Sequence, residues 1–228
     1  KKTINSKPNE IINFSWVGRI CDFKIHSLNF LIKNLSHVSV NLKQKIKLHI
    51  IGSGDKEKDL KFKNFQNDYF SITKLGTLSK EKLDLYLYEN ININASMGTS
   101  ALESAKFGIP TIVLDFSYNK INDNYSFRWL EDTINFDLGH FITHNDYLKN
   151  ITMKNIIENY KNDYARLSKN VYEYYQKNHS LDAVANNLFI TLKKSKSTFS
   201  EINPYLLRKG IVRRLYERTK YRTKNIFK

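Results

Sequence analysis

The chain has 228 residues, and its 37 lysines and arginines against 22 aspartates and glutamates give a formal net charge of +15. This length can bury a core without disulfides or metals, and 41% hydrophobic and 13% aromatic residues exclude an intrinsically disordered chain. No apolar run reaches about 18 residues, so no transmembrane helix is predicted. The single cysteine, Cys21, excludes an internal disulfide framework and suits a reducing compartment. No signal peptide is expected, because the first residues lead into no long apolar stretch.

The hydrophobic pattern alternates between strands and helices. Helices separating successive strands are typical of an α/β domain, so we expect a Rossmann-like parallel sheet flanked by helices over residues 11–194. Between 115 and 150 the pattern weakens and aromatic residues crowd together. In chain order, the predicted elements are a linker (1–10), a strand (11–17), a helix (25–36), strands (47–51 and 69–75), a helix from 79, a strand (90–95), a helix (100–107), a strand (111–114), two helices (152–176 and 180–194) and a basic tail (195–228).

The tail holds much of the positive charge. Residues 205–228 carry nine lysines and arginines against one acid, Glu217, and so supply +8 of the total of +15. Leu207, Ile211 and Leu215 recur every four residues, which predicts a basic amphipathic helix suited to an anionic membrane surface. The alternative is that this apolar stripe packs on the domain or on another part of the protein.

Two cations follow the first predicted strand. Gly18 and Arg19 come directly after Val17, and Lys24 lies five residues beyond the arginine. A guanidinium and an ammonium at a strand's carboxyl end can hold a diphosphate, since that end is the usual ligand site of a doubly wound sheet. An ordinary surface arginine and lysine is the alternative, and for this pair alone it is favoured.

Glycines follow two later strands. Gly52 and Gly54 could let the backbone approach a ligand closely, although this weak signal alone favours a tight turn. The run from Gly98 through Thr99 and Ser100 begins a helix, and free backbone N–H groups there attract anions. Glu103 lies about one turn further along, so it could accept hydrogen bonds from the same ligand. A simple capping box, with no ligand, explains this run equally well.

Taken in order, these loops resemble the C-terminal, donor-binding domain of GT-B glycosyltransferases, most closely the glycosyltransferase family 4 type. The similarity covers about residues 12–115 and depends on several motifs in the family's order and spacing. These motifs are Val17-Gly18-Arg19 with Lys24, the strand and glycines of His49–Gly54, Leu75-Gly76-Thr77-Leu78, then Gly98, Glu103, Gly108 and Pro110.

The resemblance implies a role for each matching residue. Arg19 and Lys24 would be catalytic, binding the donor's diphosphate and offsetting charge on the departing nucleotide. Glu103 would accept hydrogen bonds from the ribose hydroxyls. The backbone at 98–100 would hold the phosphates, and the segment Leu75–Leu78 would flank the base. With Glu103, the substrate-binding residues that the resemblance implies are Gly18, Gly52, Leu75, Gly76, Leu78, Gly98, Thr99 and Ser100.

The sequence departs from the family in two ways. The family has a glutamate eight residues before the second one, where this chain has Ala95. That glutamate usually contacts the donor sugar, so the resemblance does not predict sugar recognition or the stereochemical outcome. The family's N-terminal acceptor domain also has no counterpart here, so we expect this chain to be the donor half. Neither a metal nor a cofactor is expected, because the histidines show no metal-ligand spacing with Cys21.

The preferred hypothesis is therefore a hexosyltransferase-type glycosyltransferase of bacterial surface-polysaccharide synthesis. Its partners would be a nucleotide-diphosphate sugar and a glycan or lipid-linked acceptor, without nucleic acid. We expect a cytoplasmic protein, peripheral to the inner face of the membrane through residues 205–228. Two alternatives remain open: a nucleotide-sugar epimerase with a GT-B-like fold, and a non-catalytic module that binds anionic lipid or RNA.

Overall fold

The computed structural model describes residues 10–143 and 151–195. The linker predicted for 1–10 and the tail predicted for 195–228 lie outside these ranges, except for Glu10 and Ser195. The chain divides into one unit that ends at Ala183 and a second that begins at Val184. The predicted domain boundary at 194 stays a prediction.

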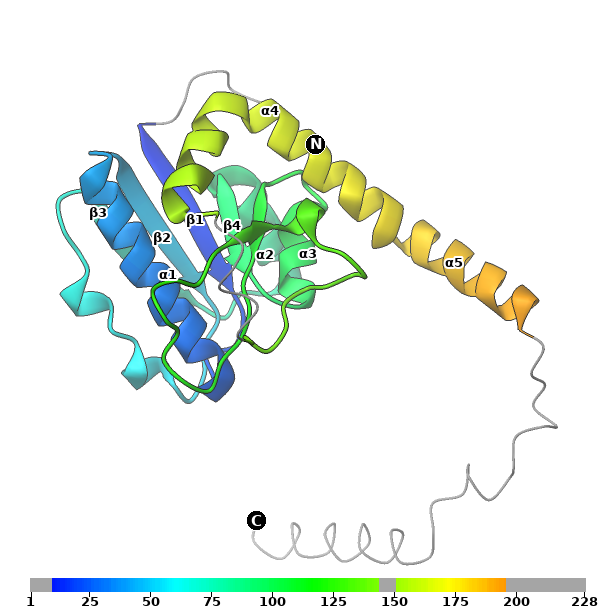
Figure 1. Cartoon of the computed structure of the whole chain (residues 1–228), viewed down its shortest axis with the longest axis horizontal. Helices are drawn as coiled ribbons and strands as arrows, with labels where there is room; N and C mark the ends of the chain where they lie inside the picture. The colour runs from blue at the N-terminus through cyan, green and yellow to red at the C-terminus, as the bar shows by residue number, and fades with distance from the viewer. Residues whose placement is uncertain (1–9, 144–150, 196–228) are drawn as a thin grey trace, which may run out of the picture. The chain divides into compact units, whose positions relative to one another are not determined.

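Within the described residues, six strands form one sheet in the order β3-β2-β1-β4-β5-β6 (Figure 1). The first five strands of the chain are parallel, and β6 is antiparallel to β5. This is the Rossmann-like parallel sheet that the sequence predicts. The chain builds outward from β1 to β3 and then crosses back to β4, so β1 and β4 meet at the topological switch point. The strands are β1 (Ile11–Val17), β2 (Lys45–Ile51), β3 (Phe70–Gly76), β4 (Ile93–Ser96), β5 (Thr111–Val113) and β6 (Arg128–Trp129).

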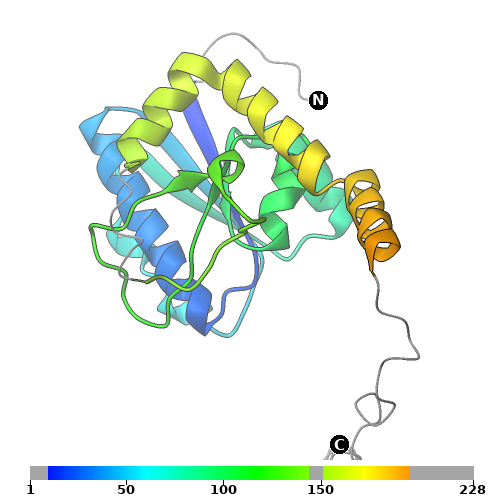
Figure 2. The ribbon, with the colours of Figure 1, turned by 45° about the vertical axis from the view of Figure 1, so that its right-hand side comes forward.

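Helices cover both faces of the sheet. Alternate β1 residues, such as Phe14 and Trp16, are buried in one core with α1 (Asp22–Asn41) and the start of α4 (Met153–Asn178). Figure 1 and Figure 2 show α1 running beside β1 and β2 on this face. The opposite face buries Val17 with Leu87 of α2 (Lys80–Asn90). Burial on both faces explains why the strands read as apolar runs.

Side-chain hydrogen bonds join β1 to β4 at the switch point. Ser15 Oγ donates to Asn94 Oδ1 over 2.9 Å, and Ser96 Oγ donates to the same oxygen over 3.0 Å. The backbone N–H of Val17 in turn donates to Ser96 Oγ over 3.1 Å. These three side chains are fully buried. They therefore fix the carboxyl ends of β1 and β4 relative to each other.

Helix α4 bends at Asp163, whose backbone is non-helical (φ −150°, ψ 51°). Before the bend, Ile157 packs in the core beside α1. After it, Val171 packs with Ala105 of α3 (Thr99–Ala105). The Asp163 carboxylate caps the second half by accepting from the backbone N–H of Arg166 over 3.3 Å. The bend lets one helix pack first beside α1 and then beside α3, as Figure 2 shows.

Several element boundaries differ from the sequence prediction. The predicted strand at 90–95 begins only at Ile93, because α2 continues to Asn90, whose side-chain amide donates to the Tyr86 carbonyl. The helix predicted at 25–36 extends over Asp22–Asn41. Strand β6 was not predicted, since a two-residue strand leaves no periodicity to detect.

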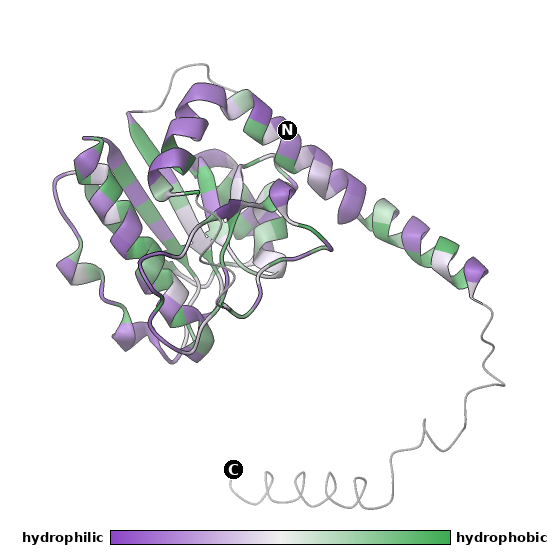
Figure 3. Cartoon of the chain, in the orientation of Figure 1, coloured by the Kyte–Doolittle hydropathy of each residue, from purple (hydrophilic) through white to green (hydrophobic). Residues whose placement is uncertain are grey.

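Helix α5 (Leu181–Lys194) lies mostly in the second unit and mixes apolar with polar residues (Figure 3). Leu181 and Leu192 are 83% and 63% exposed. None of the described helices combines the length and the hydropathy needed to span a bilayer.

Candidate functional site

A row of glycines marks the carboxyl edge of the sheet. Following the sheet order β3-β2-β1-β4, Gly76, Gly52, Gly18 and Gly98 stand at or just after the strand ends, with φ of 67°, 129°, 155° and 64°. Positive φ favours glycine, since a Cβ is strained there. Four adjacent strands therefore end at a glycine. The space that a Cβ would take is open at Gly76 and Gly98, so a ligand can approach the backbone closely at these two positions.

At Gly52 the close approach is between two loops of the chain itself. A Cβ on this residue would collide with the carbonyl oxygen of Gly18. The two loops are also joined by hydrogen bonds from Gly18 N to the Ile51 carbonyl and from Ile20 N to the Ser53 carbonyl, both 3.0 Å long. Gly52 thus holds the loop after β1 in place, whereas its predicted contact with substrate stays a prediction.

Arg19 and Lys24 lie together at the end of β1. Arg19 is exposed, and Lys24 is half-buried in the first turn of α1. The Nζ atom of Lys24 lies over Gly18, 3.5 Å from the place a Cβ would take there. Burial lowers the pKa of Lys24, and the charge of Arg19 lowers it further against an opposing effect of Cys21. Within the described residues neither cation forms an ion pair, so a bound anion would relieve their repulsion.

The loop after β4 is held by a segment from much later in the chain. The backbone N–H of Gly98 donates to the Leu138 carbonyl over 2.6 Å. That N–H is therefore already engaged, which leaves the amides of Thr99 and Ser100 as the candidates for phosphate contact. Thr99 is exposed and Ser100 is half-buried at the start of α3. Their predicted role is not tested by this geometry.

Glu103 takes part in an ion-pair network between α3 and α2. Lys106 Nζ lies 2.6 Å from Glu103 Oε2 and 2.7 Å from Asp84 Oδ1. Burial would lower the pKa of Lys106, but hydrogen bonds to the two carboxylates raise it. A carboxylate can accept about four hydrogen bonds, so Glu103 retains capacity for hydroxyl donors beside Lys106. Its assignment to ribose remains a prediction.

The segment predicted to flank the base ends β3 and continues beyond it. Leu75 and Leu78 are half-buried and pack against the core that contains Val17 and Leu87. The Thr77 hydroxyl lies 2.9 Å from the Ser53 hydroxyl, which ties the loops after β3 and β2 together. The segment is therefore fixed at the carboxyl edge, two strands away from Arg19.

Sequence reasoning missed a charged cluster at the end of β5. Asp115 has a fully buried side chain and accepts hydrogen bonds from Nη1 and Nη2 of Arg128 and from the Tyr125 hydroxyl. Arg128 Nη2 also donates to Asp137 Oδ2 over 2.8 Å, and His140 Nδ1 lies 2.8 Å from the same oxygen. Only one signal was available: Asp115 directly follows a predicted strand.

This cluster borders the switch point. Gly139 packs on the Leu114 carbonyl and Met97, next to the Leu138 carbonyl that holds Gly98. Oxygen and nitrogen atoms of Asp115, Asp137 and His140 lie within 4.8 Å of one another, as in a metal-binding group. The Arg128 guanidinium contacts both carboxylates, however, and supplies the positive charge that a metal would otherwise provide. His140 therefore lies beside the loop after β4, with 41% of its side chain exposed.

No protein-family model and no curated protein matches the chain. Among solved structures, the fold is similar to S. aureus TarM, solved as a mutant with fondaparinux, alpha-GlcNAc-glycerol and UDP (TM-score 0.51, 18% identity, 80% of this chain and 35% of that one). Two further matches are weaker. The catalytic domain of cholesterol-alpha-glucosyltransferase from Helicobacter pylori has a TM-score of 0.44 and 13% identity, over 71% of this chain and 95% of that one. The lipopolysaccharide outer core galactosyltransferase WaaB has a TM-score of 0.43 and 13% identity, over 81% of this chain and 50% of that one. The chain thus spans about a third of TarM, and its sheet and helices match one half of a GT-B fold.

Proposed function

We propose that this chain is the donor-binding half of a glycosyltransferase, which transfers a sugar from a nucleotide-diphosphate sugar to a hydroxyl group. The donor lies along the carboxyl edge of the sheet, across the switch point between β1 and β4. The similarity in fold to TarM, whose structure was solved with UDP, supports this proposal.

One observation carries the proposal. Arg19 and Lys24 lie unpaired within the described residues beside a side-chain-free backbone at Gly18. Two neighbouring cations without a counter-charge repel each other, and Lys24 also loses hydration through burial. A diphosphate offers oxygens for both cations and would raise the pKa of Lys24 toward its ordinary value.

The proposed reaction needs little covalent chemistry from this half. The acceptor hydroxyl oxygen attacks the anomeric carbon, the bond from that carbon to the diphosphate oxygen breaks, and the hydroxyl proton passes to a base. Negative charge then grows on the diphosphate, where Arg19 and Lys24 stabilise it more in the transition state than in the ground state. Glu103 positions the ribose, and the amides of Thr99 and Ser100 contact the phosphates.

The proposal also includes an acceptor, a location and a sugar. The acceptor is a glycan or a lipid-linked glycan of surface-polysaccharide synthesis. Residues 205–228 place the protein at the inner face of an anionic membrane. The sugar is a hexose.

A thermal-shift panel tests this function. The full chain is heated with UDP, GDP, ADP and CMP, alone and as their sugar conjugates. A ligand that binds only the folded state stabilises it and so raises the temperature midpoint of unfolding. At a ligand concentration a hundred times its Kd, the stabilisation is about 2.7 kcal/mol. At least one nucleotide diphosphate should raise it, and its sugar conjugate at least as much. No shift with any of these compounds at millimolar concentration would contradict the proposal.

A further inference from the structure

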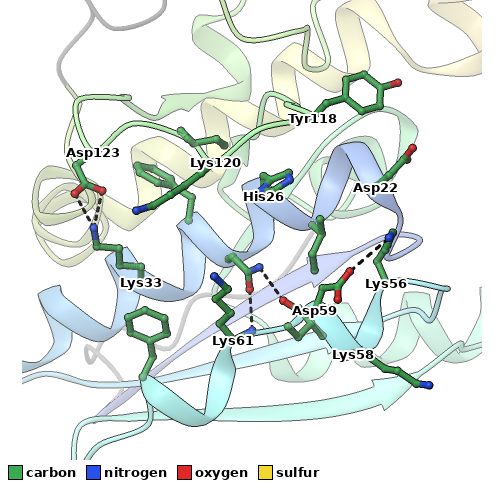
Figure 4. A pocket seen from close by; sticks show the side chains of 16 residues that line it. Asp22, His26, Lys33, Lys56, Lys58, Asp59, Lys61, Tyr118, Lys120 and Asp123 are labelled. Carbon is green, nitrogen blue, oxygen red and sulfur yellow. Dashed lines mark hydrogen bonds and ion pairs between the residues drawn. The ribbon is translucent and has the colours of Figure 1, made fainter.

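A concave site lies along α1, and the glycine row does not line it. It has a volume of about 690 Å³ and lies between α1, residues 56–65 after β2 and residues 118–123 after β5. Figure 4 shows lysines reaching it from both loops, Lys120 on one side and Lys56 and Lys61 on the other, with His26 of α1 between them. The proposed donor site does not use any of these side chains.

The groove carries an excess of positive charge. Five lysines and three aspartates line it within the described residues. Lys33 is neutralised by Asp123 over 2.6 Å, and Lys56 lies 3.6 Å from Asp59. The other three lysines that line the groove form no ion pair in the described part of the chain: Lys58, Lys61 and Lys120.

Hydrogen bonds and buried apolar residues hold the wall of the groove in place. The Asn29 side chain donates to the Asp59 carbonyl over 3.1 Å and accepts from the backbone N–H of Lys61 over 3.0 Å, which fixes the loop after β2 to α1. Ile25, Leu60 and other apolar residues form a buried floor. Rigid walls reduce the entropy that a ligand must lose on binding.

The rim offers an aromatic ring and carboxylates. Tyr118 is 58% exposed, and its ring centroid lies 6.2 Å from that of Phe23 and 6.4 Å from that of Phe141. An exposed, supported ring can stack on the apolar face of a sugar. Asp22 and Asp59 keep acceptor sites that suit hydroxyl donors, because each carboxylate accepts about four hydrogen bonds.

We infer that this groove binds an anionic saccharide, a chain that carries both charged groups and free hydroxyls. The unpaired lysines would meet the charged groups as point charges, and the carboxylates would accept from the hydroxyls. A neutral sugar would leave the lysines without counter-charge. Closely spaced phosphates without hydroxyls would offer no donors to Asp22 and Asp59 and would leave these acceptors unpaired. This inference goes beyond the proposed function and does not depend on it.

Matched double variants of the full chain test the inference. Lys61→Gln/Lys120→Gln removes two groove charges that form no ion pair in the described part of the chain. Lys161→Gln/Lys177→Gln removes two exposed charges from α4, outside the groove. Calorimetry compares tetragalacturonate with neutral maltotetraose. The parent and the α4 double variant should bind tetragalacturonate alike, and the groove variant roughly tenfold or more weakly, as for the loss of charge-assisted hydrogen bonds. Maltotetraose should bind every protein more weakly than tetragalacturonate binds the parent.

Lysine acetylation followed by mass spectrometry locates the bound saccharide. Tetragalacturonate should protect Lys61 and Lys120 from acetylation, whereas Lys161 should stay reactive. All variants share residues 205–228, so any binding by that basic segment cancels in the comparison. Equal affinity of the two double variants, or protection confined to residues 205–228, would overturn the inference. Tripolyphosphate or a short RNA that binds as tightly and protects the same two lysines would overturn the saccharide assignment.

Discussion

Gly52 shows how a single missing side chain shapes the site. A Cβ there would collide with the Gly18 carbonyl oxygen, whereas a Cβ on Gly76 would meet nothing within 4 Å, and both residues have positive φ. We therefore expect Gly52→Ala to lower the free energy of unfolding by about 3 kcal/mol or more, and Gly76→Ala by about 1 kcal/mol from strain alone. Urea unfolding followed by circular dichroism measures both. Equal losses would show that the Gly52 collision is relieved at no cost.

Glu103 gives a second prediction at the scale of one residue. Glu103→Ala should weaken nucleotide binding by about 1–3 kcal/mol through lost hydrogen bonds to the ribose. Asp84→Ala removes the other acid that contacts Lys106, so it controls for breaking the ion-pair network. Calorimetry should show weaker binding only for the Glu103 variant. The ribose assignment fails if both variants bind like the parent, or if both lose affinity equally.

At this scale the sequence placed the glycines and cations at strand ends, and the structure brings Gly18, Arg19 and Lys24 together as expected. The cluster around Asp115 could not be predicted, because its members are spread without regular spacing over the 25 residues from Asp115 to His140. The hydrogen bond from the Gly98 N–H to the Leu138 carbonyl could not be predicted from the sequence either. Such contacts depend on how the loop after β6 folds back on the sheet.

Among the elements, β2 and α2 meet at a buried histidine. His49 is 4% exposed, its Nδ1 lies 2.7 Å from the Tyr86 hydroxyl, and its Nε2 lies 3.3 Å from Asn13 Oδ1. Burial, with the nearby charge of Lys47, lowers the pKa of His49 from 6.5 to about 4. The folded state therefore holds a neutral imidazole in the pH range where the unfolded chain takes up a proton.

The sign of the resulting pH dependence follows from linkage. Between pH 6.5 and 4 the unfolded state binds more protons, so the stability that neutral His49 contributes is present above pH 6.5 and is lost as the pH falls. The resulting loss of unfolding free energy should reach about 3 kcal/mol near pH 4. In the His49→Gln variant this contribution to the pH dependence should be absent. Chemical denaturation of both proteins at pH 7, 5.5 and 4 measures the difference. Parallel curves for the two proteins would show that His49 does not titrate in this way.

Element types were easier to predict than element ends. Short apolar runs identified β1 and β5, since both faces of the sheet are covered by helices. The bend of α4 at Asp163 escaped prediction, because helical periodicity continues on both sides of it. Strand β6 pairs with β5 through two residues only, and its position is fixed by tertiary packing rather than by its own sequence.

For the whole molecule, we expect binding without efficient transfer. The described residues match one half of a GT-B fold, and the chain spans 35% of the TarM structure. Position 95, where the family that the sequence resembles has a sugar-contacting glutamate, is a fully buried alanine in β4. The purified 228-residue chain should therefore bind the donor nucleotide but transfer little sugar to added glycans. A radiolabelled-sugar transfer assay checks this, and multiple turnovers would mean that these residues also hold an acceptor site.

The central claim is that the donor diphosphate binds beside Arg19 at the switch point. Isothermal titration with the nucleotide that gives the largest thermal shift tests it in three proteins: the parent, Arg19→Ala, and Arg166→Ala on the exposed surface of α4. The Arg166 variant should bind like the parent, and Arg19→Ala should lose about 1–3 kcal/mol, or roughly 5–150-fold in Kd. If circular dichroism shows all three folded and their Kd values agree, the donor does not bind at this edge of the sheet.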